Sequence, residues 1–100
     1  MSKGITDSDK KTILDVIKNF FPAAKMYFFG SRFLQTNKPG SDLDLCLRSD
    51  QKLDLSQWSK LEEALAQTDL PYKVDVSDWN RISAEFQAII LKDFEEWKIK

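Results

Sequence analysis

Three aspartates and a glycine-serine pair are the residues whose types and spacing suggest chemistry in this sequence. Gly30 and Ser31 follow a short apolar run, and ten residues separate them from Asp42 and Asp44. The 42–48 segment alternates between leucine and other residues, so its two aspartates project together from one face of a predicted strand. Their Cα atoms would lie roughly 6.8 Å apart, two rises of about 3.4 Å. This geometry suits two carboxylates that reach over one metal ion or pair of ions.

The third aspartate, Asp75, lies within a second alternating segment, Tyr72–Ser77, where aspartate is intrinsically disfavoured. Mg²⁺ binds through a few carboxylates together with substrate phosphates. Two such ions about 3.5–4 Å apart can stabilise the attacking and leaving oxygens of an in-line displacement. A third carboxylate can also take a proton from the attacking hydroxyl. The set therefore points to two-metal phosphoryl or nucleotidyl transfer, with Asp42, Asp44 and Asp75 as candidate catalytic and metal-binding residues.

The glycine-serine pair has properties that suit a phosphate. Glycine lets the backbone approach a ligand closely, and a helix that starts at Ser31 would present free N–H groups to an anion. Arg32 and Lys38 are the two cations inside the motif, and each could contact phosphate or be solvated. A lone Gly-Ser is usually a turn, and a lone Asp-Leu-Asp is usually the solvated face of a strand. Their combination at this separation favours a site.

The elements that must position these residues are predicted from hydrophobic periodicity, caps and turn formers. Residues 1–5 read as a loose lead-in, and Gln35–Ser41 as a loop. The expected helices and strands are a helix from Thr6 or Asp7 to Phe20, strand Lys25–Phe29, a helical turn over Ser31–Gln35, strand Asp42–Arg48, helix Leu55–Thr68, strand Tyr72–Ser77 and helix Ile82–Trp97. This order, α-β-β-α-β-α, predicts an α/β (α+β) fold in which a small mixed sheet of three to four strands packs against helices.

Composition limits the class of protein. One hundred residues, 42% hydrophobic and 31% charged, are typical of one soluble globular domain spanning residues 1–100. The net charge of −1 gives no general attraction to nucleic acid, so direct nucleic-acid binding is not expected. The absence of histidine excludes histidine-based triads, and the single Cys46 reads as a small buried filler. No apolar run approaches the ~20 residues of a membrane span, and no hydrophobic signal segment is present, so we expect a cytoplasmic protein.

Gly30-Ser31, ten residues and Asp42-Leu43-Asp44, with Pro39-Gly40-Ser41 leading in, resemble the GSX10DXD motif of the polymerase-beta-like nucleotidyltransferase superfamily. In length and element order the chain is similar to its minimal nucleotidyltransferases, over about residues 10–95. The resemblance implies that Gly30 and Ser31 hold a nucleoside triphosphate. It also implies that Asp42 and Asp44 bind both Mg²⁺ ions and that Asp75 is the third carboxylate. The further nucleotide-binding candidates are Arg32, Lys38 and Ser41.

Many minimal members are antitoxins that silence a HEPN-domain RNase toxin by transferring AMP to a toxin tyrosine. The resemblance thus implies transfer of a nucleoside monophosphate, AMP from ATP above all, to a hydroxyl of a partner toxin. One departure is the bulky Phe33-Leu34-Gln35, which stands where the family often has small residues and another glycine. It bears on how the triphosphate fits and which nucleotide is preferred.

Two other functions are consistent with the sequence. The chain could be a non-catalytic antitoxin or assembly subunit that acts by occlusion, or a transferase for a small molecule such as an aminoglycoside. The apolar face expected for Ile82–Trp97 exceeds what a domain of this size needs, so this C-terminal helix is a candidate for homo- or hetero-oligomer contacts.

Overall fold

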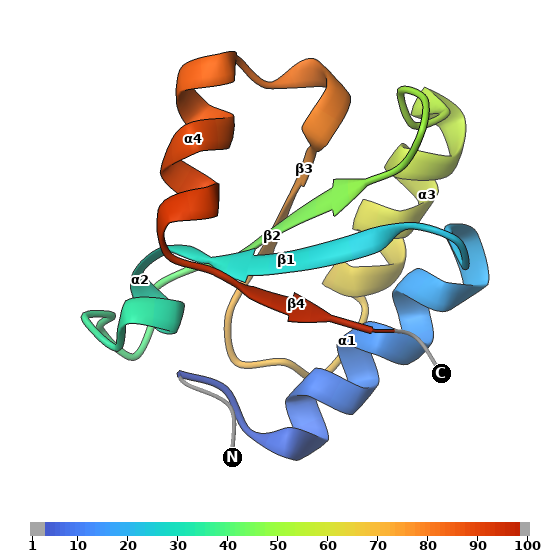
Figure 1. Ribbon diagram of the computed structural model, residues 1–100. Helices are drawn as coiled ribbons and strands as arrows, with labels where there is room; N and C mark the ends of the chain where they lie inside the picture. The colour runs from blue at the N-terminus through green and yellow to red at the C-terminus, as the bar shows by residue number, and fades with distance from the viewer. Residues whose placement is uncertain (1–3, 99–100) are drawn as a thin grey trace.

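The computed structural model describes residues 4–98, in which a four-stranded sheet separates two layers of helices (Figure 1). The elements in chain order are α1 (Asp7–Phe20), β1 (Lys25–Phe29), α2 (Gly30–Leu34), β2 (Leu43–Arg48), α3 (Leu55–Ala66), β3 (Val74–Asp78), the 3₁₀ helix η1 (Trp79–Arg81), α4 (Ala84–Lys92) and β4 (Glu95–Trp97). The expected α/β fold with a small mixed sheet is therefore confirmed.

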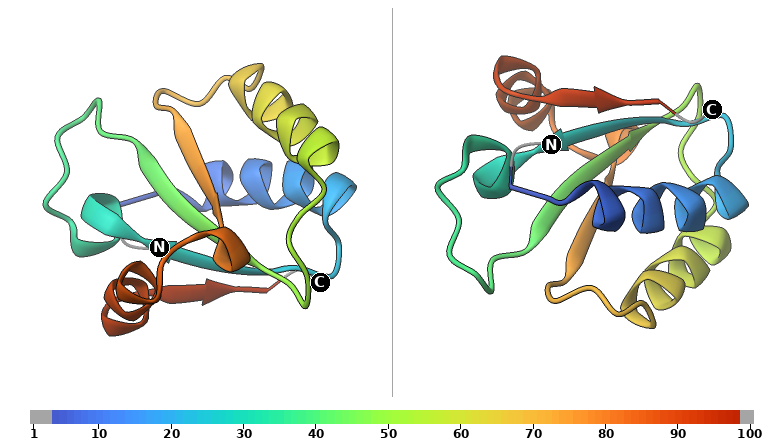
Figure 2. Two further views of the ribbon diagram at one scale, coloured as in Figure 1. Left: turned by 90° about the horizontal axis from the view of Figure 1, so that it is seen from above. Right: turned by 90° about the horizontal axis from the view of Figure 1, so that it is seen from below.

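The strand order is β3-β2-β1-β4, with β1 antiparallel to β2 and β4 and with β2 parallel to β3. Helices α1 and α3 cover one face of this sheet, and α4 lies on the other (Figures 1 and 2). Seen from above, α4 lies beside β4 and α2, and no helix crosses the beginnings of β2 and β3 (Figure 2, left). One part of this second face is thus left open.

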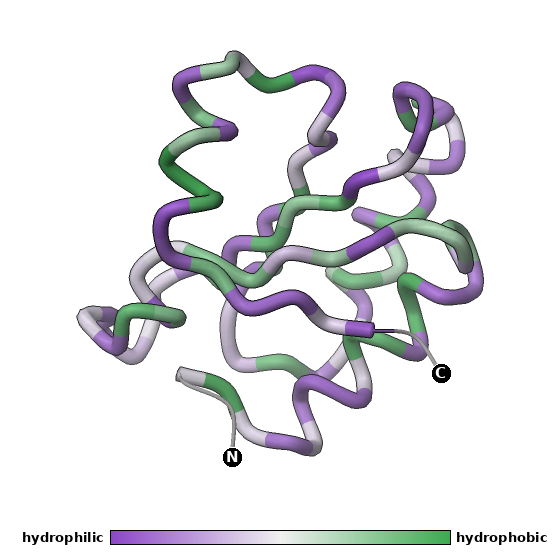
Figure 3. The backbone as a smooth tube through the Cα atoms, in the orientation of Figure 1, coloured by the Kyte–Doolittle hydropathy of each residue, from purple (hydrophilic) through white to green (hydrophobic). Residues whose placement is uncertain are grey.

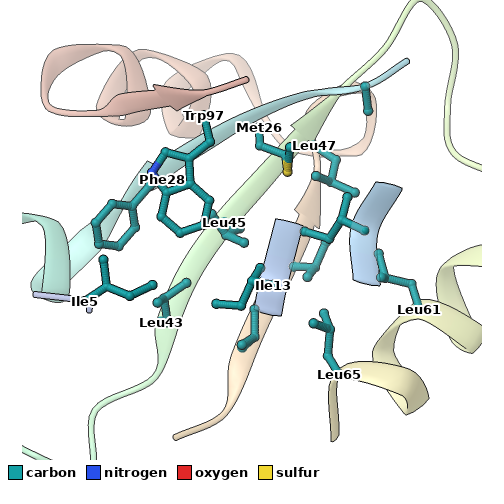
Figure 4. Close-up of a cluster of buried hydrophobic side chains, with 14 of the residues drawn as sticks. Ile5, Ile13, Met26, Phe28, Leu43, Leu45, Leu47, Leu61, Leu65 and Trp97 are labelled. Atoms are coloured by element: carbon teal, nitrogen blue, oxygen red, sulfur yellow. The ribbon is translucent and has the colours of Figure 1, made fainter. Parts of the chain in front are cut away.

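The main hydrophobic core lies between the sheet and the α1/α3 layer (Figure 4). Leu43, Leu45 and Leu47 of β2 are all fully buried there, which confirms the face predicted from their alternation. Ile13 and Ile17 give α1 one buried side, and the tube coloured by hydropathy shows this helix alternating between hydrophobic and hydrophilic residues (Figure 3). Burial on this face fixes the register of β2, because a slip of one residue would expose every leucine.

A second, smaller cluster lies on the opposite face, under α4 and η1. It consists of Tyr27, Phe29, Cys46, Trp79 and Ile90. The Cys46 side chain is fully buried, as expected for a small filler. Burial, and after it the charge of Asp78, raises the pKa of the thiol to about 12.

Side-chain caps start the longer helices where the sequence predicts. Thr6 Oγ1 accepts a hydrogen bond from the amide of Asp9, and Asp54 Oδ1 accepts one from the amide of Gln57. In the part of the chain that the structure describes, no helix is long and apolar enough to cross a bilayer.

The prediction of one helix from Ile82 to Trp97 is wrong. Helix α4 ends at Lys92, and β4 then pairs with β1, so that Trp97 lies opposite Met26. The Trp97 ring is buried in the main core, 5.1 Å from the ring of Phe28, on the other side of the sheet from α4. The apolar residues of this segment therefore serve two different faces. Contact with an oligomeric partner through α4 stays a prediction.

The lead-in is also more ordered than expected. Ile5 is buried in the main core, and the backbone of Gly4 lies against α2. Residues 1–3 of the predicted lead-in lie outside the described residues. The other boundaries differ little: α3 ends at Ala66 rather than Thr68, and β3 begins at Val74 rather than Tyr72.

Candidate active site

The register of the sheet places two of the three aspartates side by side. Asp44 in β2 is the direct partner of Asp75 in β3 and of Phe29 in β1. Residues directly opposite each other in neighbouring strands share a face, so Asp44 and Asp75 project from the same face. This is the face opposite the buried leucines, where the beginnings of β2 and β3 are left open. Asp42 lies exposed, two residues before Asp44, at the entry to β2.

Gly30 brings the β1–α2 turn onto this pair. Its φ is +84°, a conformation that residues with a Cβ rarely adopt. A Cβ built at this position would lie 2.2 Å from Oδ2 of Asp44. Glycine is required here for two reasons, namely the backbone conformation and the close approach of the Asp44 carboxylate. The glycine of the motif and its second aspartate are therefore in direct contact.

The electrostatics of Asp44 reflect this arrangement. Its side chain is half-buried, and burial raises the pKa of its carboxyl to about 6, with the charges of Asp75 and Asp42 contributing after it. Two ion pairs are found among residues 4–98, Lys11–Asp15 and Asp78–Arg81. Neither includes one of these three carboxylates, so within that range they have no cationic partner. A bound cation would relieve their mutual repulsion.

The donor set fits Mg²⁺, although the carboxylates do not form a closed cage. Among the residues described, no three Cys, Asp or Glu side chains are gathered closely enough to bind a metal by themselves. Mg²⁺ is usually held by one or two carboxylates, and water and substrate phosphates supply its other ligands. Asp44 and Asp75, side by side on an open face, match that mode, and Asp42 lies two residues before Asp44.

The loop that precedes Asp42 is built around a tight turn. The Ser41 hydroxyl accepts a hydrogen bond from the amide of Lys38, at 3.0 Å, and the Lys38 carbonyl accepts one from the amide of Ser41. These contacts give Ser41 a local structural role. The exposed Lys38 and the half-buried Ser31, in the first turn of α2, remain candidates for phosphate contact.

Arg32 lies differently from what its sequence context suggests. The residue is 7% exposed, and its guanidinium donates hydrogen bonds to the carbonyls of Gly4, Pro39 and Ser41. The same group stacks on the Tyr72 ring, 3.9 Å from its centroid. These contacts favour a structural role over the predicted contact with phosphate.

The bulky residues after Arg32 do not fill the aspartate face. The Phe33 ring lies edge-on to Phe28, 5.8 Å between centroids, and packs on the main core. Leu34 is exposed, and Gln35 ends α2 in the left-handed conformation. The Phe33 ring is thus directed toward the α1 side of the sheet.

Asp78, the last residue of β3, is a buried charge. It is 1% exposed and accepts hydrogen bonds from the amides of Leu53 and Asn80 and from Nε of Arg81. It thereby joins the end of β3 to the segment before α3. It lies three residues beyond Asp75 and belongs to the framework of the fold.

Comparison with known proteins agrees with this geometry. The family model described as Polymerase beta, Nucleotidyltransferase matches residues 11–96. The chain belongs to the polymerase beta nucleotidyltransferase family. The resemblance carried by the GSX10DXD motif is thus confirmed, and with it the expectation of a nucleotidyltransferase.

A named protein and two solved structures are also similar to this chain. The chain is 34% identical over 88 residues to the "Probable protein adenylyltransferase MntA" of Haemophilus influenzae, an alignment that covers 88% of this chain and 77% of that protein. Two solved structures share the fold. A crystal structure of a toxin-antitoxin with AMP-PNP has a TM-score of 0.77 and 23% identity, over 90% of this chain and 73% of that one. The structure of a tri-AMPylated Shewanella oneidensis HEPN toxin in complex with an MNT antitoxin has a TM-score of 0.72 and 21% identity. This match covers 94% of this chain and 73% of that one.

Proposed function

We propose that this nucleotidyltransferase transfers AMP from ATP to a tyrosine hydroxyl of a HEPN toxin and so acts as its antitoxin. The observation that carries the proposal is the pairing of Asp44 with Asp75 beside Gly30, a geometry suited to nucleotidyl transfer. The choice of AMP is supported by the relative named as a protein adenylyltransferase. The choice of acceptor is supported by the similar fold in a structure with an AMPylated HEPN toxin.

In this proposal the reaction joins the toxin oxygen to the α-phosphorus of ATP, and the bond to the β-phosphate breaks so that pyrophosphate leaves. Asp42, Asp44 and Asp75 would hold Mg²⁺, which would neutralise the phosphates and the charge that develops on them. Asp75 is exposed and takes the proton of the attacking hydroxyl. Gly30 keeps the backbone close to the ligand, and Ser31 donates to the phosphates.

Incubation with α-labelled ATP, Mg²⁺ and a HEPN protein tests the proposal. That protein is the product of an adjacent reading frame where one exists, and a lysate of the source cells replaces it otherwise. Label should appear on the toxin with the wild-type chain. The Asp42→Asn/Asp44→Asn variant should lose about 10²- to 10³-fold or more of this transfer, because it removes the charges that position and stabilise the reacting phosphates.

A matched control removes the same charge elsewhere. Asp50→Asn/Asp69→Asn changes two exposed loop aspartates and should label the toxin as the wild type does. Equal labelling by the Asp42→Asn/Asp44→Asn variant would refute the assigned site. If that variant instead blocks the toxin without any AMP transfer, the chain acts by occlusion. Transfer to an aminoglycoside in the absence of a toxin would assign it to the small-molecule enzymes.

A further inference from the structure

The guanidinium of Arg32 lies where several segments that carry the site meet. It donates from Nη2 to the carbonyl of Pro39, at 2.8 Å, and from Nε to the carbonyl of Ser41, at 2.9 Å. Ser41 immediately precedes Asp42, so both bonds hold the loop that leads into the first aspartate. A charged donor makes these bonds stronger than ordinary amide bonds.

The aromatic partner of Arg32 leads to the third aspartate. The guanidinium lies 3.9 Å from the ring centroid of Tyr72, three residues before Asp75. The Tyr72 hydroxyl donates to Oδ2 of Asp9 at the start of α1, at 2.9 Å, and this bond fixes the ring against the helix. Burial, then the hydrogen bond to Asp9 and the charge of Asp9, raise the pKa of the Tyr72 hydroxyl, so it remains a donor well above neutral pH.

The N-terminal segment closes the remaining side. Nη1 of Arg32 donates to the carbonyl of Gly4, at 3.2 Å. A Cβ at Gly4 would lie 1.9 Å from the carbonyl oxygen of Arg32, so this glycine allows the two backbones to touch. Nε, Nη1 and Nη2 each have a protein acceptor, and a buried guanidinium without such acceptors would be strongly unfavourable.

We propose that Arg32 is a positioning residue, which fixes the segments leading into Asp42 and Asp75 relative to the start of α2. Its forked guanidinium is needed because it bonds several carbonyls and stacks on a ring at once, which a lysine ammonium does not reproduce. The effect on transfer rests on the proposed function. The effect on the 38–42 loop does not.

The test compares Arg32→Met and Arg32→Lys with Arg48→Met. Arg48 is a suitable control, since it also stacks on an aromatic ring, that of Trp79, and bonds a tyrosine hydroxyl, but far from this loop. Amide hydrogen exchange, measured without nucleotide, should be accelerated about tenfold or more over residues 38–42 in both Arg32 variants and unchanged there in Arg48→Met. Exchange in β1 and β2 reports in the same experiment that each variant is folded.

The kinetic test separates positioning from phosphate binding. Both Arg32 variants should lower kcat for AMP transfer by about tenfold or more, with the KM for ATP changed by less than about threefold. A phosphate contact would give the opposite result: Arg32→Lys would keep most of the activity and Arg32→Met would raise the KM for ATP, with exchange in the loop unaltered. That result overturns the proposal. If Arg32→Met does not fold, Arg32→Lys and Tyr72→Leu are judged by the same criteria. If the wild-type chain transfers no AMP at all, the proposed function fails, and hydrogen exchange over residues 38–42 alone decides whether Arg32 is a positioning residue.

Discussion

Replacing Gly30 by alanine tests the contact on which the candidate site depends. The residue has a φ of +84°, and a left-handed backbone costs a residue with a Cβ about 1–2 kcal/mol. In a domain of this size that loss lowers Tm by about 4–16 °C, at about 4–8 °C per kcal/mol. Domains of this kind have about 5–15 kcal/mol of stability, so the variant should still fold.

The effect on activity should be larger than the effect on stability. The new Cβ would lie 2.2 Å from Oδ2 of Asp44, and ordinary contacts begin near 3.4 Å, so the carboxylate must move by about 1.2 Å. A misplacement of about 1 Å in a catalytic group can cost about 100-fold in rate. We therefore expect Gly30→Ala to lower AMP transfer about 100-fold, measured with labelled ATP under conditions where the variant is fully folded.

Gly40→Ala is the matched control from the same motif. The φ of Gly40 is not positive, and a Cβ built there would meet nothing within 4 Å. This variant should keep its activity and gain a few tenths of a kcal/mol from a less flexible unfolded chain. In an Asp44→Ala background, Gly30→Ala should destabilise less than in the wild type, because the colliding carboxylate is gone. Equal activity and Tm for Gly30→Ala and Gly40→Ala would refute the contact.

Three further predictions concern charge. The pKa of Asp44 is raised above its unfolded value, so the folded protein binds this proton more tightly than the unfolded chain. The free energy of unfolding should therefore fall as pH rises from about 4 to about 6. Urea unfolding in EDTA should show a smaller fall for Asp44→Asn than for the wild type. Mg²⁺ should raise the Tm of the wild type but not that of Asp42→Asn/Asp44→Asn, since an ion that binds only the folded state stabilises it, and an equal rise would contradict the assigned ligands. Asp78→Ala should cost about 3 kcal/mol or more, because it leaves the amides of Leu53 and Asn80 and Nε of Arg81 without their acceptor. As the control for Asp78→Ala, Asp15→Ala breaks the exposed pair with Lys11 and should cost less than about 1 kcal/mol in urea unfolding.

Local patterns were sufficient to predict the strands that carry the aspartates. The alternation of Leu43, Leu45 and Leu47 reflects a strand with one fully buried face, and such a strand tolerates no other register. The helix caps at Thr6 and Asp54 act over three residues, so they too can be recognised from the sequence. The motif spacing then placed Gly30 and Asp44 in one site.

Contacts between distant residues explain what the sequence did not reveal. The segment 95–97 is too short for a period-two pattern to emerge, and only its pairing with β1 makes it a strand. Arg32 bonds Gly4, 28 residues away, and stacks on Tyr72 in a third segment. No local signal distinguishes such an arginine from one that binds phosphate. The same applies to Asp78, whose partner Leu53 lies 25 residues earlier.

The single cysteine provides a built-in reporter of opening of the fold. The Cys46 side chain is fully buried on the α4 side of the sheet, and its thiol has a pKa of about 12, so almost none of it is the reactive thiolate at neutral pH. Alkylating reagents can therefore modify the native chain only after α4 or the whole domain has moved away. The rate of labelling would measure how often that opening occurs, and the same protection should shield the thiol from oxidation while the domain stays closed.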